Sequence, residues 1–424
     1  MNFRLFPTLL VLAATPWLAA TARADHPEDN ADDARAGHSL HGDAFNEGPR
    51  QAAYLMEGMP KINFPVTTRS AEAQKFFNQG VGQLHGFWYF EAERSFRQAA
   101  ALDTNCAMAY WGMAMANVNN ARRAKEFTER AVAMTNGLGR RECLWIESMA
   151  RFHKVDGKGE RQSSRSRTGK TSSGSSTNKG SITGASTNNA PASTASSADS
   201  DRHRTFVRSL EQLIEEFPDD LEAKAFLVVK VWDNQKNGLR IPSHTAVDAL
   251  ANEVLAADPM HPVHHYRIHL WDEEKARRAL NSAALCGQGS PGVAHMWHMP
   301  GHIYSRLNRH ADVAWQQEAS ARVDHAHMMR DRVLPDEIHN YAHNNEWLIR
   351  SLSSQGRARE AVDLAKNMIE LPRHPKFNTL TAYLHPTNEI STNNVQAYQR
   401  RTSSARHGRS SLAVQLVNHR STLH

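Results

Sequence analysis

The sequence predicts an all-α fold, an α-solenoid of stacked helical hairpins with one disordered insertion. Apolar residues recur at helical spacing through residues 68–153 and again through 203–375. Phe76 and Tyr110 are 34 residues apart, an interval that is typical of a repeated helical hairpin. Residues 157–201 are mostly Ser, Thr, Gly and Asn, which cannot bury enough apolar surface to offset the entropy of ordering.

The first 24 residues have the features of a secretory signal peptide. Arg4 precedes an apolar run over residues 9–14, and an A-x-A cleavage site follows at 22–24. We therefore expect an exported protein, periplasmic or extracellular, without a membrane span. Residues 25–67 are expected to form a mobile leader and a short segment that packs on the first helix.

The block 68–153 is expected to contain the first hairpins. The apolar spacing predicts a helix that begins near Ser70, a second that ends near Leu102, a third around Tyr110, and a further helix over residues 142–152. The aromatic run at 87–90 is expected to turn the chain between the first two helices.

Helical spacing resumes in the block 203–375 after the predicted insertion. Three single helices are expected, followed by three hairpins, at residues 206–217, 223–232, 247–257, 261–271 with 274–285, 292–307 with 310–323, and 336–353 with 358–369. Residues 376–424 show no amphipathic pattern. We hypothesise that they form a disordered, non-native tail, as a truncation or a shifted reading frame would produce, because a solenoid normally ends in a capping helix.

Charge and cysteine content exclude two classes of function. The formal net charge of +6 is concentrated in the low-complexity insertion and the tail, so the folded body is mildly acidic. A basic groove for nucleic acid is therefore not expected. The three cysteines are too few and too widely spaced for a disulfide framework or a zinc knuckle, and we interpret them as small buried residues.

Histidine is the residue type that stands out. Twelve of the 24 histidines lie between residues 261 and 343. The HxxxH spacing, which places two rings on one face of a helix, occurs at His261/His265, His265/His269, His298/His302 and His339/His343. These pairs fall on the first helix of each predicted hairpin, and such helices line the concave surface of a solenoid.

Convergence of these helices would create a site for a divalent transition metal such as zinc. The predicted ligands are His295, His298 and His302, with His339 or His343. Neutral imidazole is the ligand, so metal affinity should fall below about pH 6. Two observations favour instead a structural, hydrogen-bonding role for the histidines: Pro300 stands between His298 and His302, and no pair reads HExxH.

The same surface could bind a peptide or an anionic ligand. The residues predicted to line such a groove are His264, His265, Arg267, His269, Arg306, Asn340, Asn344 and Arg350. No phosphate-binding glycine loop, nucleophile elbow or CxxC motif is found in the sequence, and their absence favours a protein that is not an enzyme.

Several motifs resemble those of uncharacterised bacterial tetratricopeptide repeat proteins. They are H-Y-x-I-H at 265–269, H-M-P-x-H-I-Y at 298–304 and H-N at 339–340, together with the run GFWYFEAERSF at 86–96. The resemblance covers about 70–153 and 203–375. It implies an all-α solenoid of tetratricopeptide-like hairpins, and it brings no established activity.

Two functions are therefore predicted. The first is an exported scaffold that binds a protein or peptide in its concave groove without catalysis. The alternative is a histidine-based metal-binding protein, or a metal-dependent hydrolase, that uses the cluster at His295, His298, His302, His339 and His343.

Overall fold

The computed structural model describes residues 52–118, 120–155, 197–335, 338 and 341–372. Over these residues the protein is all-helical, with fourteen α-helices in contiguous packing and no strand. The predicted all-α, solenoid-like fold is confirmed. The predicted signal peptide, leader, tail and most of the insertion lie outside the described residues, as do His339 and Asn340.

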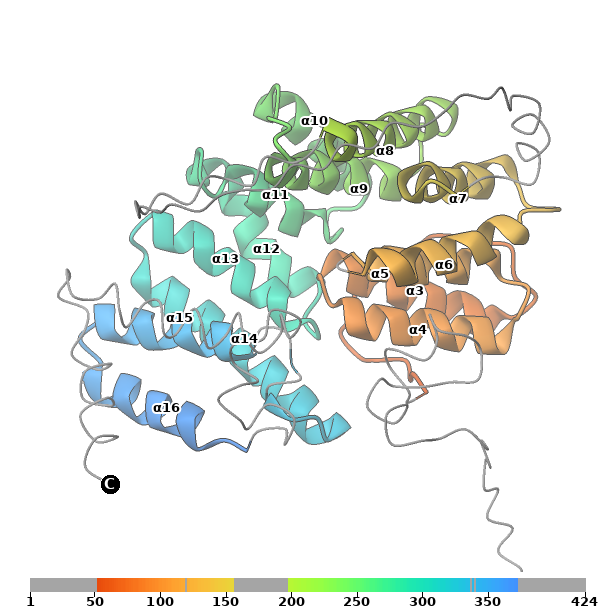
Figure 1. Ribbon diagram of the computed structural model, residues 1–424. Helices are drawn as coiled ribbons and strands as arrows, with labels where there is room; N and C mark the ends of the chain where they lie inside the picture. The colour runs from red at the N-terminus through yellow and green to blue at the C-terminus, as the bar shows by residue number, and fades with distance from the viewer. Residues whose placement is uncertain (1–51, 119, 156–196, 336–337, 339–340, 373–424) are drawn as a thin grey trace, which may run out of the picture.

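The helices follow one another as a continuous stack (Figure 1). They are α3 (Ala71–His85), α4 (Tyr89–Leu102), α5 (Ala107–Ala116), α6 (Ala121–Ala133), α7 (Arg140–His153), α8 (Ser197–Glu216), α9 (Leu221–Asp233), α10 (His244–Ala257), α11 (Val263–Trp271), α12 (Leu280–Gly289), α13 (Ala294–Arg306), α14 (His310–Asp331), α15 (Tyr341–Ser354) and α16 (Ala358–Glu370). Each helix packs on the next one, and α3–α5, α5–α7, α9–α11 and α11–α13 also touch. Contacts between alternate helices are those of a solenoid, in which equivalent helices of neighbouring hairpins lie side by side.

Helices α3 to α7 enclose an aromatic core. Its largest fully buried members include Phe64, Phe77, Phe96, Trp111 and Trp145, and their rings contact one another at centroid distances between 5.1 and 6.2 Å. A Cβ atom added at Gly112 would lie only 2.4 Å from the Phe96 ring. Glycine therefore lets the backbone of α5 approach this ring closely.

The observed elements differ from the predicted ones in several places, among them α14, which runs to Asp331 and not to residue 323. Helix α6 was not predicted, although Ala124, Phe127 and Ala131 form its buried face. Helix α8 begins at Ser197, inside the segment 157–201 that was predicted to be an insertion. A short 3₁₀ helix, η4 (Ala276–Ala279), precedes α12, which consequently begins later than predicted.

The segment before α3 contacts the chain immediately before α13. The carbonyl of Gly58 accepts a hydrogen bond of 2.8 Å from the backbone N–H of Gly292, just before α13. A Cβ atom at Gly292 would meet the carbonyl oxygen of Glu57 at 2.4 Å. This backbone approach requires glycine and fixes the start of α13, the helix that carries three of the histidines described below.

Two further predictions concern cysteines and membranes. Cys106, Cys143 and Cys286 are all free thiols. Cys106 and Cys286 are buried, as the sequence predicts, whereas Cys143 is only half-buried. None of the helices within the described ranges is both long and apolar enough to cross a bilayer.

Candidate metal centre

Six histidines from α11, α13 and α15 form two neighbouring groups of three. We call His298, His302 and His343 the α13–α15 triad, and we call His265, His269 and His295 the α11–α13 triad. Within each triad, one ring nitrogen of every histidine lies within 4.8 Å of the other two. Three nitrogens at this spacing are close to the arrangement in which histidines bind one transition-metal ion.

In the α13–α15 triad, Nε2 of His298 and Nε2 of His302 are 2.9 Å apart. The ring of His343 reaches the same point from α15, with its centroid 4.7 Å from that of His298. Pro300 lies within α13, which continues unbroken from Ala294 to Arg306. Pro300 therefore does not disrupt the i, i+4 spacing of His298 and His302.

The ring of His298 is oriented by Gln317 on α14. Its Nδ1 lies 2.7 Å from Oε1 of Gln317, while the amide nitrogen of Gln317 donates to the His298 carbonyl at 3.1 Å. The second bond identifies the amide oxygen as the atom that faces the ring, so Nδ1 of His298 is the donor. A Cβ atom at Gly301 would lie 2.2 Å from the amide nitrogen of Gln317, so only glycine leaves room for this side chain.

The ring of His302 is oriented by Asp272, which follows α11. Nδ1 of His302 lies 3.1 Å from Asp272 Oδ2, and Nε of Arg306 donates to the other oxygen at 3.2 Å. Burial alone would raise the pKa of Asp272, but the hydrogen bonds and charges of His302 and Arg306 outweigh it and lower that pKa. An ionised carboxylate can only accept, so Nδ1 of His302 carries a proton.

These two partners determine the state of the facing Nε2 atoms. Because neutral imidazole carries one proton, His298 and His302 each direct an Nε2 lone pair at the other across 2.9 Å. Two lone pairs at this distance repel unless a proton or a metal cation lies between them. His298 is 1 % exposed and burial lowers its pKa well below the usual range, so a proton between the rings would have to be carried by Nε2 of His302, beside Asp272.

The α13–α15 triad is open on one side. The His302 side chain is 22 % exposed and that of His343 is 32 % exposed. Trp347 on α15 forms the wall beside them, with its ring 4.5 Å from that of His302. Three histidines with an accessible face would leave a coordination position for water or a small ligand.

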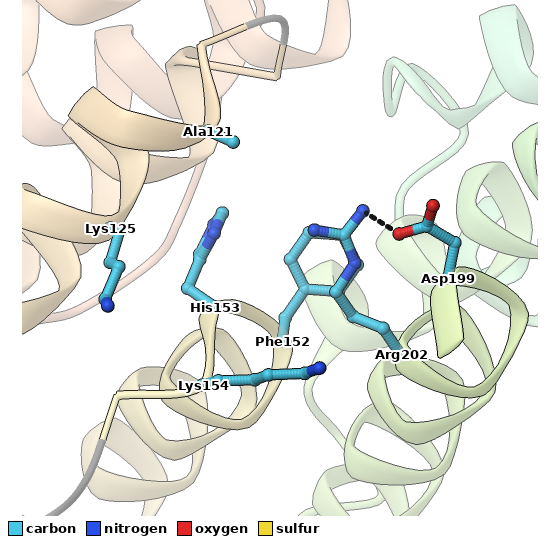
Figure 2. Close-up of a pocket in the computed structure, with 7 residues that line it drawn as sticks. All are labelled: Ala121, Lys125, Phe152, His153, Lys154, Asp199 and Arg202. Atoms are coloured by element: carbon cyan, nitrogen blue, oxygen red, sulfur yellow. Dashed lines mark ion pairs between the residues drawn. The ribbon is translucent and has the colours of Figure 1, made fainter. Parts of the chain in front are cut away.

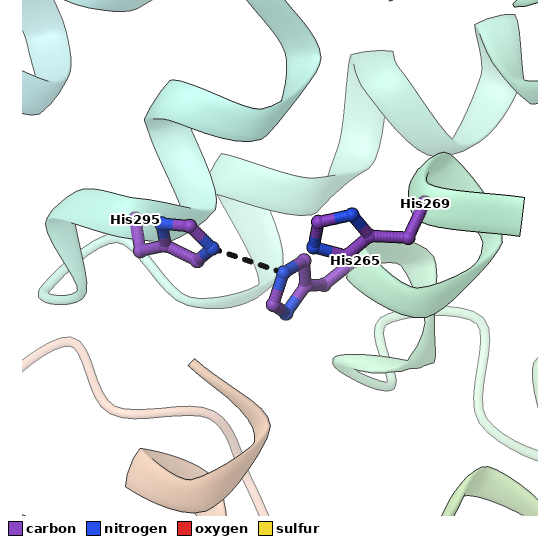
Figure 3. A group of neighbouring side chains, drawn as sticks. All are labelled: His265, His269 and His295. Carbon is purple, nitrogen blue, oxygen red and sulfur yellow. Dashed lines mark hydrogen bonds between the residues drawn. The ribbon is translucent and has the colours of Figure 1, made fainter. Parts of the chain in front are cut away.

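The α11–α13 triad joins two helices (Figure 3). Nε2 of His295 lies 3.1 Å from Nε2 of His265, and the His269 ring centroid is 4.7 Å from that of His265. Nδ1 of His265 donates to the carbonyl of His85 at 2.6 Å, so its Nε2 is again a lone pair. Burial lowers the pKa of His265 to about 3 and that of His269 well below the usual range.

Aromatic rings surround the α11–α13 triad. The Phe87 ring lies 4.5 Å from the His265 ring and 5.6 Å from that of His269, and the Trp232 ring stacks on His269 at 4.0 Å. Phe87 has a φ of 54°, a left-handed conformation that is unfavourable for an aromatic residue. This strained turn between α3 and α4 directs its ring at the histidines.

A third group, His85, Glu222 and His261, is fully engaged within the protein. His85 contacts Tyr266 OH through Nδ1 and Glu222 through Nε2. His261 contacts Glu222 through Nε2 and accepts the N–H of Val263 at Nδ1. Each ring nitrogen thus has a protein partner, so we interpret this group as structural; it also positions the His85 carbonyl that orients His265.

Several residues predicted to line a peptide groove are engaged elsewhere. His264 is buried between Ser282 and the carbonyl of Pro259, Arg267 pairs with Asp248, and the side-chain nitrogen of Asn344 donates to Asp324. The two exposed arginines pair with carboxylates, Arg306 with Asp272 and Arg350 with Glu346. Of the predicted groove residues, only His265 and His269 belong to a triad.

The ligand set predicted from the sequence is divided by the structure. His298, His302 and His343 come together, whereas His295 joins His265 and His269, which were predicted to be groove residues. Sequence reasoning also missed Asp272 and Gln317. Their spacing to the histidines gives no signal, because each comes from a separate segment that reaches the site only after the helices pack.

A surface pocket elsewhere contains neither triad. It lies between α6, α7 and α8 and is lined by Ala121, Lys125, Phe152, His153, Lys154, Asp199 and Arg202 (Figure 2). Asp199 pairs with Arg202 at 3.1 Å. Burial and the nearby cations Arg202, Lys125 and Lys230 lower the pKa of His153 to about 4. The pocket is therefore surrounded mainly by positive charge.

In comparisons with known proteins, no protein-family model matches this chain, and no curated protein sequence matches it. The function is therefore inferred from the geometry of the site.

Proposed function

We propose that this protein binds a divalent transition-metal ion at His298, His302 and His343. The observation that carries the proposal is the approach of the Nε2 atoms of His298 and His302 to 2.9 Å while the Nδ1 atom of each faces an acceptor. A cation between the rings resolves the repulsion of the two lone pairs. Zn–N bonds of about 2.0–2.1 Å in tetrahedral geometry need nitrogens about 3.3 Å apart, so a small outward shift suffices.

The surroundings of the triad support the same function. Metal-binding histidines usually donate their second ring nitrogen to a carboxylate or amide oxygen, which fixes the tautomer and makes the ring a better ligand. Asp272 and Gln317 supply these two acceptors for His302 and His298. The ligands are all imidazoles, which suit zinc, copper or nickel and do not suit magnesium or calcium.

Binding of a metal, rather than hydrolysis, is the activity we propose. The nearest carboxylate, Asp272, is held by His302 and Arg306 and is therefore unsuited to act as a general base. Peptide binding by the solenoid stays a prediction. The engagement of His264, Arg267 and Asn344 elsewhere makes it the less favoured function.

The test is metal binding by the purified protein and a His298→Ala/His302→Ala variant. We expect isothermal titration with zinc to show tight binding by the native chain and the loss of this event in the variant. His264→Ala is the matched control, because His264 is also buried but both of its ring nitrogens have protein partners. A zinc titration that the double substitution leaves unchanged, or no binding by the native chain, would refute the proposal.

A further inference from the structure

We propose that the α11–α13 triad, His265, His269 and His295, binds a second transition-metal ion beside the first, so that six imidazoles form a two-ion centre. This inference rests on the proposed function, because it places a second ion next to the ion bound by the α13–α15 triad. The sequence did not predict this second site, because its pattern placed His265 and His269 in a peptide groove.

The hydrogen bonds of the triad leave a cation as the best common partner. Nε2 of His265 is a lone pair, because Nδ1 donates to the His85 carbonyl. A proton on Nε2 of His295 would satisfy the 3.1 Å contact between these two rings. This proton would do nothing for Nε2 of His269, which is buried and has no hydrogen-bond partner among the described residues. A buried polar atom without a partner is costly, whereas one metal ion binds all three nitrogens.

The walls of this second site are built at an energetic cost. Phe87 adopts a left-handed backbone conformation, and its ring covers His265, His269 and His295 at centroid distances of 4.5 to 5.6 Å. Trp232 covers His269 from another element. Strained residues of this kind concentrate at functional sites, where they hold side chains in place and exclude water.

The two sites are adjacent because they share α13. His295 and His298 are one turn apart, and their rings are stacked with centroids 5.8 Å apart. Each ring belongs to a different triad. Two divalent ions at such a separation repel each other, so a small anion between them, such as hydroxide, would stabilise the pair. The two sites would therefore take divalent transition-metal ions that prefer imidazole ligands, such as zinc or copper.

The experiment measures the number of ions bound and their proximity in the full chain. After loading with Cu²⁺ and removal of the excess, we expect about two ions per native chain, and about one in either His269→Ala or His302→Ala. The electron paramagnetic resonance spectrum of the native protein should show magnetic coupling between the ions. Either single substitution should replace it with the spectrum of isolated Cu²⁺. The control His264→Ala should keep both ions and the coupling.

The possible failures of the two proposals differ. One ion in the native chain that His302→Ala removes and His269→Ala retains would overturn the second site and leave the proposed function intact. No tightly bound ion in the native chain would overturn both. Two ions without magnetic coupling would overturn the two-ion centre while leaving two separate sites. Circular dichroism identifies unfolded variants, and His269→Gln then replaces His269→Ala as the test.

Discussion

The N-terminal and C-terminal hairpins use the same architecture but fill their shared faces with different chemistry. Between α3 and α7 the packed face consists of hydrocarbon and aromatic rings, among them Phe77, Trp111 and Trp145. Between α11 and α15 the corresponding face carries six imidazoles. Apolar rings need only close packing, whereas each buried imidazole needs a partner for both nitrogens.

This difference shows which region stabilises the fold and which supports a function. The aromatic core lowers the free energy of the folded state by burial alone. The histidine face places lone pairs opposite each other and is therefore a poor way to stabilise a protein without a cation. Substitutions in the aromatic core between α3 and α7 should consequently change the stability of the metal-free protein. Substitutions of the histidines between α11 and α15 should change metal binding.

The largest expected effect comes from the aromatic core. Trp111→Ala removes a fully buried ring and should lower the free energy of unfolding by about 3–5 kcal/mol. Trp111→Phe should cost less, because Nε1 of Trp111 is buried without a hydrogen-bond partner among the described residues. Urea unfolding of metal-free protein measures both changes. Equal losses in the two variants would contradict this account of the core.

The next effect is a pH dependence in the C-terminal hairpins. Burial raises the pKa of Asp324 on α14 to about 7, although Asn344 on α15 donates to it. Tyr341 on α15 also senses the charge of Asp324. The pKa of Tyr341 is raised as well, so this side chain stays neutral in this pH range. The folded state thus holds a proton that the unfolded chain releases near pH 4.

The contribution of Asp324 to stability should therefore be complete at about pH 4 and be lost as the pH rises to about 7. The total decline attributable to Asp324 is on the order of 4 kcal/mol. Asp324→Asn should remove this part of the pH dependence, as measured by urea unfolding at a series of pH values. An unchanged slope in the variant would show that Asp324 titrates normally.

Metal should stabilise the histidine face by a somewhat smaller amount. An ion that binds only the folded state adds about 2.7 kcal/mol at a hundred times its Kd. Replacing His298 and His302 together with leucine should abolish the part of this increment that the α13–α15 triad contributes. In metal-free protein the substitution removes two facing lone pairs but also leaves the buried Oε1 of Gln317 without its donor, so we expect a loss of about 1–3 kcal/mol. Thermal unfolding with and without zinc separates the two effects. A large loss of stability without metal would indicate a purely structural role for these rings.

The smallest effect concerns the residues behind the ligands. Asp272→Asn should weaken metal binding by about 10–100-fold, because it removes the charge that fixes the His302 tautomer. Glu273→Gln is the control, since the Glu273 side chain is 86 % exposed and pairs with Arg306 at 3.7 Å. Competition with a zinc chelator provides the two dissociation constants. Similar constants for both variants would exclude a role for Asp272 in orienting His302.

The sequence predicted the helices well because apolar spacing alone determines which face of each is buried. It also placed the histidines on neighbouring first helices. It could not predict how they divide, because His295 faces α11 whereas His298, one turn later, faces α15. The turn at Phe87 was predicted, but the contact of its ring with the histidines was not, and neither were the roles of Asp272 and Gln317, since these contacts depend on how separate hairpins pack.

The most direct test of the central claim is anomalous diffraction at the zinc absorption edge from crystals of the zinc-loaded protein. We predict a peak within about 2.0–2.1 Å of one ring nitrogen each of His298, His302 and His343. Zinc bound only at other histidines, with the Nε2 atoms of His298 and His302 still in direct contact, would contradict it.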